Sequence, residues 1–200
     1  MSEYVKFSCE RVVGEIAPLG RLAELNAYRR KLLDLSLIGI DSNGVGFGNL
    51  SMRDGATDNF YITGSATGGI HELTLANCAK VVAFDFERNR VRYEGSALPS
   101  SESLTHAAIY ESDATAGAII HCHNSELWGA LLSEAPTTSK AAEYGTPEMA
   151  TEIMQLFTRS DVQSRKIVVM AGHEGGILTF GKDLEEAFAV LVRERKKIRP

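Results

Sequence analysis

Two of the five histidines in this chain stand two positions apart, in the segment His121-Cys122-His123. Residues i and i+2 of a β-strand point to the same face of a sheet, so both imidazoles can converge on one ion. Cys122 then points to the other face, where we expect a buried structural thiol and not a metal ligand. Two hydrogen-bonded histidines at a strand end would explain the same spacing, so both interpretations stay open at this point.

A third histidine, His173, follows an apolar segment and has glycines around it, in Gly172-His173-Glu174-Gly175-Gly176. The missing side chains let a ligand or an ion approach the backbone closely. Three histidines with an open fourth position are typical of catalytic zinc, so His173 beside the first pair predicts a metal site. Asn49 lies in a similar glycine-rich segment, where a simple turn residue is the alternative interpretation.

An anion site is predicted around Ser100, Ser101 and Glu102. We expect Ser100 or Ser101 to cap a helix N-terminus, where free amides and the positive end of the helix dipole favour an anion. Glu102 falls in the first turn, next to any bound anion or metal, although the dipole alone would also favour a surface glutamate there. His106, one turn further on, is expected to be a packed or solvent-bonded histidine.

Helices and strands must interleave to bring these segments together. Apolar residues spaced by three or four predict helices from Gly20 to about Leu37 and from Leu184 to about Lys197. Further helices are predicted at 101–111, 125–133 and 147–157, and strands at 48–53, 60–63, 80–86, 91–93, 116–123, 166–170 and 176–180. Because the strands and helices lack a strict βαβ rhythm, we expect an α/β sandwich with a central sheet covered by helices.

Composition limits the class of protein. A hydrophobic content of 44% and a charged content of 24% are typical of a globular chain, and 200 residues fit a single domain over 1–200. The net charge of −5 excludes the basic field that drives non-specific nucleic-acid binding. No apolar run approaches the roughly 20 residues that cross a bilayer, so no membrane partner is expected. Three cysteines without a CxxC pair favour a reducing, cytoplasmic location.

Six short motifs follow one another along the chain, and together, in this order, they are specific for one protein family. They are GNLSMR (48–53), YIT (61–63), LPSSE (98–102), HCH (121–123), GTPEMA (145–150) and GH…FGKDLEEA (172–187). On these motifs the chain resembles the class II aldolase/adducin family over about residues 20–190. The resemblance implies a three-layer α/β/α sandwich with a central, largely antiparallel sheet. It also implies a homo-oligomer, usually a tetramer, with active sites at subunit interfaces.

The resemblance assigns roles to individual residues. It implies that His121, His123 and His173 bind Zn²⁺, or another divalent ion such as Mn²⁺, Co²⁺ or Fe²⁺, and that Glu102 is the catalytic acid/base. It further implies a group of polar residues that hold the phosphate of the substrate: Asn49, Ser65, Ser100 and Ser101.

Two positions depart from the family pattern. After YIT the family has a Pro-Ser/Thr-Gly turn, whereas this chain has Gly64-Ser65-Ala66, so alanine replaces a glycine that would approach a phosphate without a Cβ. Some members extend a tyrosine into a neighbouring subunit's site. Ala141 aligns with that tyrosine, and Tyr144 is the tyrosine nearest to it in the sequence. Tyr144 and Lys140 are therefore the candidates for a residue that extends into a neighbouring subunit's site.

The resemblance implies a zinc-dependent aldehyde-lyase that acts on a small keto-sugar phosphate. In this hypothesis the metal stabilises the enediolate left by retro-aldol cleavage, and Glu102 moves a proton at the adjacent carbon. The alternatives are a dehydratase or an epimerase of the same family, or a metal-dependent sugar-acid binding protein without turnover. Epimerases of the family tend to carry aspartate at the position of Glu102. In adducin the fold is an interaction domain without the metal histidines, all three of which are present here.

Overall fold

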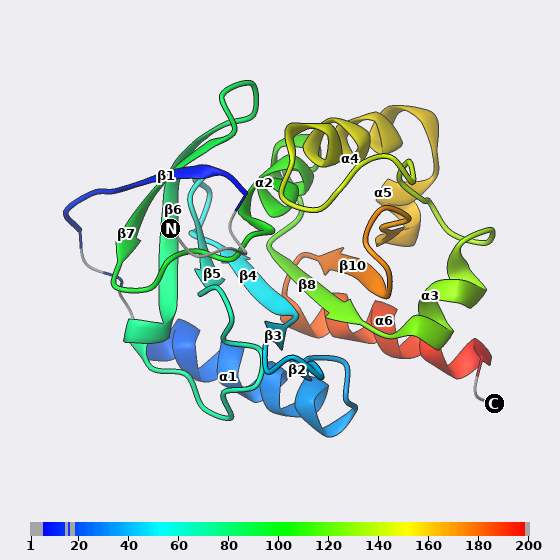
Figure 1. Cartoon of the computed structure of the whole chain (residues 1–200), viewed down its shortest axis with the longest axis horizontal. Helices are drawn as coiled ribbons and strands as arrows, with labels where there is room; N and C mark the ends of the chain where they lie inside the picture. The colour runs from blue at the N-terminus through cyan, green and yellow to red at the C-terminus, as the bar shows by residue number, and fades with distance from the viewer. Residues whose placement is uncertain (1–5, 15, 17–18, 199–200) are drawn as a thin grey trace.

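A mixed sheet of eight strands forms the centre of the computed structural model, which describes residues 6–14, 16 and 19–198 (Figure 1). In spatial order the strands are β1 (Ser8–Arg11), β7 (Arg90–Gly95), β6 (Cys78–Asp85), β5 (Phe60–Thr63), β4 (Asn49–Arg53), β8 (Ala118–His123), β10 (Gly176–Gly181) and β9 (Ile167–Val169). The β1–β7 pair is parallel and the other neighbouring pairs are antiparallel, which confirms the predicted, largely antiparallel sheet. Residues 1–5, 15, 17, 18, 199 and 200 of the predicted domain lie outside the described residues.

Helices cover both faces of the sheet, as Figure 1 shows. One hydrophobic cluster packs beneath α2 (Ser103–Ser112), α4 (Pro147–Arg159) and α5 (Val162–Arg165). A second cluster packs beneath α1 (Leu19–Asp34), α3 (Ser125–Leu131) and α6 (Leu184–Ile198). The α/β sandwich with helices on both faces of the sheet is therefore confirmed. Among the described helices, none is long and apolar enough to cross a membrane.

Strand β8 is buried on both faces, and its alternation decides where its histidines point. Ile119 belongs to the hydrophobic cluster beneath α2 and α4, whereas Ile120 and Cys122 belong to the cluster beneath α1 and α6. Because successive side chains of a strand point to opposite faces, His121 and His123 share the α2 side of the sheet with Ile119. The predicted separation of Cys122 from the two histidines is confirmed.

Several local features differ from the sequence predictions. The first helix ends at Asp34 instead of near Leu37, because Ser36 adopts a positive φ of 54° that a helix cannot continue through. Helix α2 begins at Ser103, and its N-cap is Glu102 and not Ser100 or Ser101, because the Ser103 amide already donates to the Ser100 carbonyl in a preceding turn. Strand β1 and the hairpin β2 (Gly39–Ile40) to β3 (Gly46–Phe47) were not predicted.

Candidate metal centre

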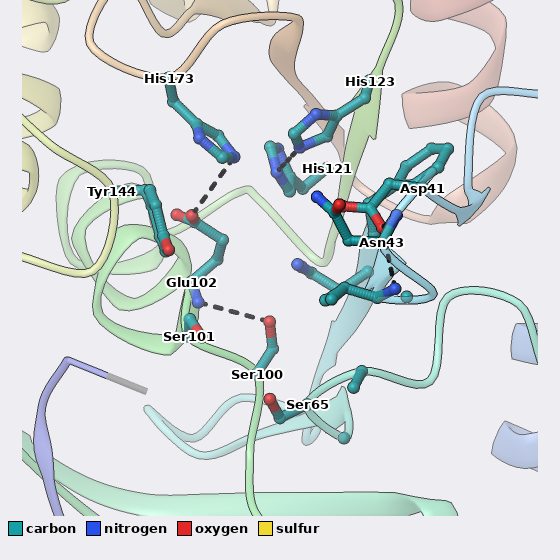
Figure 2. Close-up of a pocket in the computed structure, with 17 residues that line it drawn as sticks. Asp41, Asn43, Ser65, Ser100, Ser101, Glu102, His121, His123, Tyr144 and His173 are labelled. Carbon is teal, nitrogen blue, oxygen red and sulfur yellow. Dashed lines mark hydrogen bonds and ion pairs between the residues drawn. The ribbon is translucent and has the colours of Figure 1, made fainter. Parts of the chain in front are cut away.

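Three histidine side chains converge on one point above the end of β8 (Figure 2). One ring nitrogen from each of His121, His123 and His173 lies within 4.8 Å of the others. The Nε2 atoms of His121 and His123 are 3.0 Å apart, and the rings of His123 and His173 meet edge to face with centroids 4.6 Å apart. This arrangement aims several nitrogen lone pairs at one small volume.

The two β8 histidines are held by the neighbouring strands. The His121 Nδ1 atom lies 3.2 Å from the Ile177 carbonyl of β10, and the tautomer that donates there leaves the Nε2 lone pair for a metal ion. The backbone amide of His123 donates to the Leu37 carbonyl, and the Phe47 ring packs against the His123 imidazole with centroids 5.4 Å apart. These contacts fix the direction of both imidazoles before any ion binds.

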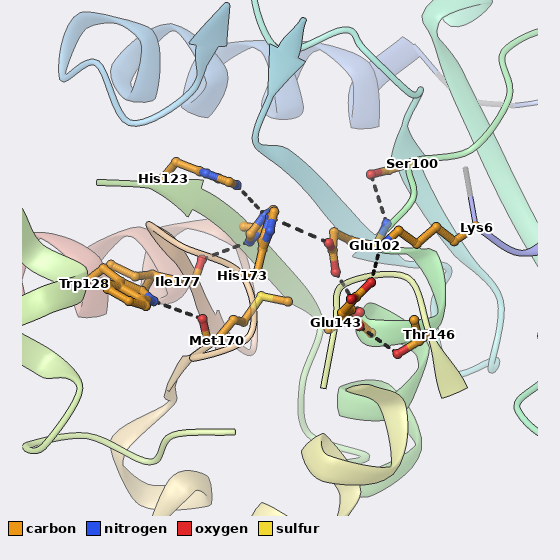
Figure 3. Close-up of polar contacts among 12 residues, drawn as sticks. Lys6, Ser100, Glu102, His123, Trp128, Glu143, Thr146, Met170, His173 and Ile177 are labelled. Carbon is orange, nitrogen blue, oxygen red and sulfur yellow. Dashed lines mark hydrogen bonds and ion pairs between the residues drawn. The ribbon is translucent and has the colours of Figure 1, made fainter. Parts of the chain in front are cut away.

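His173 lies in the tight turn between β9 and β10. Its backbone amide donates to the Met170 carbonyl, and its own carbonyl accepts from the Gly176 amide. The indole Nε1 of Trp128, in α3, donates to the same Met170 carbonyl at 2.9 Å (Figure 3). A helix on the far face of the sheet therefore helps to hold the turn that carries the third histidine.

The glycines around His173 are required by packing. A Cβ on Gly172 would lie 2.0 Å from the Ala142 carbonyl oxygen, and a Cβ on Gly176 would lie 2.6 Å from the His173 ring. Close approach of the backbone, which the sequence suggested as a way to admit a ligand, here serves to seat the turn against neighbouring chain segments.

Glu102 is buried beside the histidines. Its Oε2 atom accepts a hydrogen bond from the Thr105 hydroxyl at 2.7 Å, while Oε1 lies 4.0 Å from His173 Nε2. Among the described residues, Oε1 has no hydrogen-bond partner. Burial raises the pKa of Glu102 to about 7 and lowers the pKa of His173 to about 3. The His173 ring is therefore neutral at neutral pH, so the 4.0 Å contact is not an ion pair there.

The donor set fits a divalent cation. Burial lowers the pKa of His123 to about 4 and holds that of His121 well below its usual value, so all three imidazoles are unprotonated at neutral pH. A buried carboxyl oxygen without a partner is costly unless something binds it. Three neutral imidazoles and a nearby carboxyl group are the ligand chemistry that Zn²⁺ and similar ions prefer.

A cavity of about 360 Å³ opens next to the histidines. Its walls contain every residue predicted for the site: Asn49, Ser65, Ser100, Ser101, Glu102, His121, His123 and His173. The two remaining histidines are elsewhere. His71 is exposed, and His106 is buried with its Nδ1 atom 2.7 Å from the Ser51 hydroxyl, in agreement with the prediction of a packed histidine.

The predicted phosphate residues form one wall of this cavity. Asn49 is buried, and its Oδ1 atom has no partner among the described residues. The Ser100 hydroxyl accepts a hydrogen bond from the Glu102 amide at 3.3 Å. Ala66 has a φ of 58°, the left-handed conformation that glycine adopts more easily. The turn after Ser65 therefore keeps a glycine-like backbone although the glycine itself is replaced.

Three further side chains, Tyr144, Lys6 and Asp41, lie in the cavity wall or beside it. Tyr144 lines its own chain's cavity, with its ring centroid 4.6 Å from that of His173, and its contact with a neighbouring subunit stays a prediction. Lys6 lies over the Tyr144 ring at 4.0 Å and forms an ion pair with Glu143 at 2.9 Å (Figure 3). Asp41, from the β2–β3 turn, also lines the cavity. No motif in the sequence marked Asp41 as a site residue.

Fold and site together define the class of protein: an α/β sandwich with a candidate divalent-cation centre at the end of a central strand. Residues 41–194 match the family described as the class II aldolase and adducin N-terminal domain. This span contains every predicted site residue. The chain belongs to the class II aldolase/adducin family, as its motifs predicted. No curated protein gives a significant match to the sequence.

Solved structures show the same fold. An L-fuculose 1-phosphate aldolase is 26% identical, with a TM-score of 0.67 over 92% of this chain and 84% of that chain. YgbL from Klebsiella pneumoniae, described with aldolase, epimerase and decarboxylase as alternative activities, is 16% identical, with a TM-score of 0.67 over 92% and 89% of the two chains. L-fuculose-1-phosphate aldolase from Thermus thermophilus is 18% identical, with a TM-score of 0.63 over 90% and 92%.

The first prediction separates the histidines from the cysteine between them. The protein should retain about one zinc ion per chain after dialysis, because three protein ligands with an open fourth position are the usual set of a catalytic zinc site. The double variant His121→Ala, His123→Ala should lose it, because one imidazole cannot hold the ion. Cys122→Ala is the matched control, since the buried Cys122 thiol lies between the two histidines and points to the other face. Elemental analysis of the three proteins decides the matter, and full metal content in the double variant would contradict the assignment.

The second prediction concerns stability against pH in the metal-free protein. The pKa of Glu102 is raised from 4.5 to about 7, so the folded chain holds this proton more tightly than the unfolded chain. Its contribution to stability is complete below pH 4.5 and is lost as the pH rises through 7. Relative to Glu102→Gln, the wild-type free energy of unfolding should fall by about 3 kcal/mol over this window.

Urea denaturation at a series of pH values measures this difference. The histidines have lowered pKa values and therefore change stability in the opposite direction, but they do so in both proteins and cancel. Parallel pH profiles for the wild type and Glu102→Gln would show that the carboxyl group is not held neutral by burial.

Proposed function

We propose that the protein is a zinc-dependent aldehyde-lyase that cleaves a small keto-sugar phosphate by a retro-aldol reaction. One observation carries the proposal: three unprotonated imidazoles and a buried, partly unpartnered carboxyl group lie around one cavity in the described part of the chain. Membership of the class II aldolase family supports lyase chemistry, and the structural likeness to L-fuculose 1-phosphate aldolase supports a phosphorylated sugar as substrate.

In this proposal His121, His123 and His173 hold the metal ion, with Zn²⁺ as the first choice and Mn²⁺, Co²⁺ or Fe²⁺ as alternatives. A bound divalent ion supplies Lewis-acid chemistry, polarising the carbonyl and hydroxyl oxygens of the substrate. The chain contributes the orientation of the ligands, because the contacts to Ile177, Phe47 and Met170 direct the histidines in advance.

Glu102 is the proposed acid/base. With a pKa raised to about 7 by burial, it exchanges a proton readily near neutral pH, where catalytic acids and bases are most effective. It delivers a proton to the carbon next to the carbonyl after the carbon–carbon bond breaks, and it removes that proton in the reverse direction. Thr105 holds one carboxyl oxygen, so the other oxygen faces the histidines and the cavity.

The proposed phosphate contacts are Asn49, Ser65, Ser100 and Ser101. Ser100 and Ser101 directly precede the N-cap of α2, where the dipole of a helix of 10 residues favours an anion. The serines and the asparagine supply neutral hydrogen-bond donors, so they orient the phosphate without adding charge.

A dehydratase or an epimerase of the same family is the second candidate. The description of YgbL, which names an epimerase and a decarboxylase beside an aldolase, supports keeping it. Glu102 supports the aldolase, because epimerases of the family tend to carry aspartate there. A protein that binds a sugar acid without turnover is the third candidate, and the proton-exchange assay described next tests it.

The third prediction tests Glu102 without knowledge of the natural substrate. The zinc-loaded protein should exchange the hydroxymethylene proton of dihydroxyacetone phosphate into deuterated water. Glu102→Gln should slow this exchange by about 10² to 10⁴, the usual contribution of a positioned acid/base. Metal content should not change, because three histidines hold the ion.

The matched control is Glu143→Gln, which makes the same substitution at an exposed carboxylate outside the cavity wall. Its exchange rate should stay within about threefold of the wild type, as for most surface substitutions. Undiminished exchange in Glu102→Gln would remove Glu102 from the chemistry. Binding of the compound without exchange by the zinc-loaded wild type would support the binding protein instead.

We also propose a single domain over 1–200 that assembles as a cytoplasmic homotetramer. The family resemblance supports the assembly. So do two exposed apolar side chains, Ile40 and Ile70: Ile40 packs against Gly69, the residue that precedes Ile70 in the chain. The fourth prediction is a sedimentation coefficient of a tetramer at micromolar concentration. A monomer under the same conditions would contradict the assembly and would leave the metal site untouched.

A further inference from the structure

The described part of the cavity wall has no positive side chain. Among the described residues, no lysine or arginine contributes to its walls, and Asp41 adds a negative charge. An anionic substrate would therefore depend on neutral donors, on the dipole of α2 and on the metal at one end, with no charged side chain in the described wall to balance its charge at the other end. A positive side chain that favours the anion must therefore lie outside the described wall.

A buried guanidinium binds the loop that continues from the cavity wall. Arg29, in α1, is fully buried, and its Nη2 atom donates to the carbonyl oxygens of Thr67, Gly68 and Ile70, at 2.9, 3.2 and 2.7 Å. No carboxylate among the described residues forms an ion pair with it, and its Nε and Nη1 atoms have no partner there. Burial lowers the pKa of Arg29 only to about 10, so the side chain keeps its charge at neutral pH.

The peptide segment that Arg29 binds is the continuation of the cavity wall. Ser65 and Ala66 line the cavity, and Thr67 follows immediately and closes the turn through its hydroxyl bond to the Gly64 carbonyl at 2.7 Å. On its other side the segment packs against β3, where a Cβ on Gly68 would lie 2.1 Å from the Phe47 carbonyl oxygen. The loop 64–70 is therefore clamped between the guanidinium and a strand.

We propose that Arg29 is the positioning residue for the anionic end of the substrate. It fixes loop 64–70 through three carbonyl groups and supplies an unpaired positive charge at the segment that directly follows Ser65 and Ala66. The ligand class is an organic phosphate, whose charge would compensate a guanidinium that has no carboxylate partner among the described residues. The inference rests on the proposed function, because it assumes that the Ser65 end of the cavity receives the phosphate.

The test compares a charged and a neutral form of the same small molecule. Dissociation constants for dihydroxyacetone phosphate and for dihydroxyacetone are measured on the zinc-loaded protein, for the wild type, Arg29→Met, Arg29→Gln and Arg29→Lys. In the two neutral variants, affinity for the phosphate ester should fall about tenfold or more, while affinity for dihydroxyacetone should change less than about twofold. Arg29→Lys keeps the charge and should retain most of the preference. Zinc content should be equal in all four proteins.

The matched control is Asn26→Ala, one turn earlier in α1. Asn26 is buried and bonds the backbone of Leu73 through both ends of its amide, so it anchors the same region without a charge. Its loss should affect the charged and the neutral compound equally. A similar, equal loss for both compounds in Arg29→Met or Arg29→Gln would show that Arg29 is merely structural and would overturn the inference. Unchanged affinity for the phosphate ester in either neutral variant would also overturn it.

Two outcomes separate this inference from the proposed function. If the wild type prefers the phosphate ester and the neutral variants keep that preference, the inference fails and the proposed function stands. If the wild type does not prefer the phosphate ester, the phosphate assignment fails and the inference fails with it. If both neutral variants fail to fold, Arg29→Lys provides the test. A preference for the phosphate ester over dihydroxyacetone that stays within about threefold of the wild-type value supports the role of charge, and loss of that preference overturns the inference.

Discussion

The Nε2 atoms of His121 and His123 face each other at 3.0 Å inside the protein, and this contact restricts the protonation states of the whole site. Two protonated imidazoles at that distance would repel each other strongly in a region of low polarizability, so the site requires neutral rings. Burial lowers their pKa values and raises the pKa of Glu102 beside them. The same desolvation that makes the imidazoles available as ligands thus makes the carboxyl group a proton carrier near neutral pH.

Three segments far apart in the chain meet at this point, and different interactions position each of them. Strand β8 presents two histidines through simple alternation in a sheet covered on both faces. The β9–β10 turn is seated by a backbone hydrogen bond, by Trp128 and by a glycine that leaves room for the Ala142 carbonyl. The start of α2 brings Glu102 and two serines to the opposite wall.

The parts that depend on local pattern could be predicted from the sequence. Alternation in β8 separated Cys122 from the two histidines, and the glycine-flanked His173 stood out as a third ligand candidate. Motif order then predicted the family and the largely antiparallel sheet. The exact start of α2 was wrong because a turn at Ser100 competes with the helix for the same carbonyl group.

Features that depend on distant parts of the chain gave no local signal. Lys6 reaches Tyr144 from almost the other end of the sequence, and β1 joins the sheet through a parallel pairing with β7. Arg29 reads as an ordinary charged residue of an amphipathic helix, and only the folded chain shows that it is buried behind loop 64–70. Burial of a charge is decided by what packs over it, which composition and periodicity do not contain.

X-ray absorption at the zinc edge, combined with anomalous diffraction from a crystal of the zinc-loaded protein, locates the ion and identifies its ligand atoms. We expect one ion between the imidazoles of His121, His123 and His173, with nitrogen or oxygen neighbours at about 2.0–2.2 Å and no sulfur at about 2.3 Å. An ion bound through the Cys122 sulfur, or no anomalous peak among the three histidines at full zinc loading, would contradict this assignment.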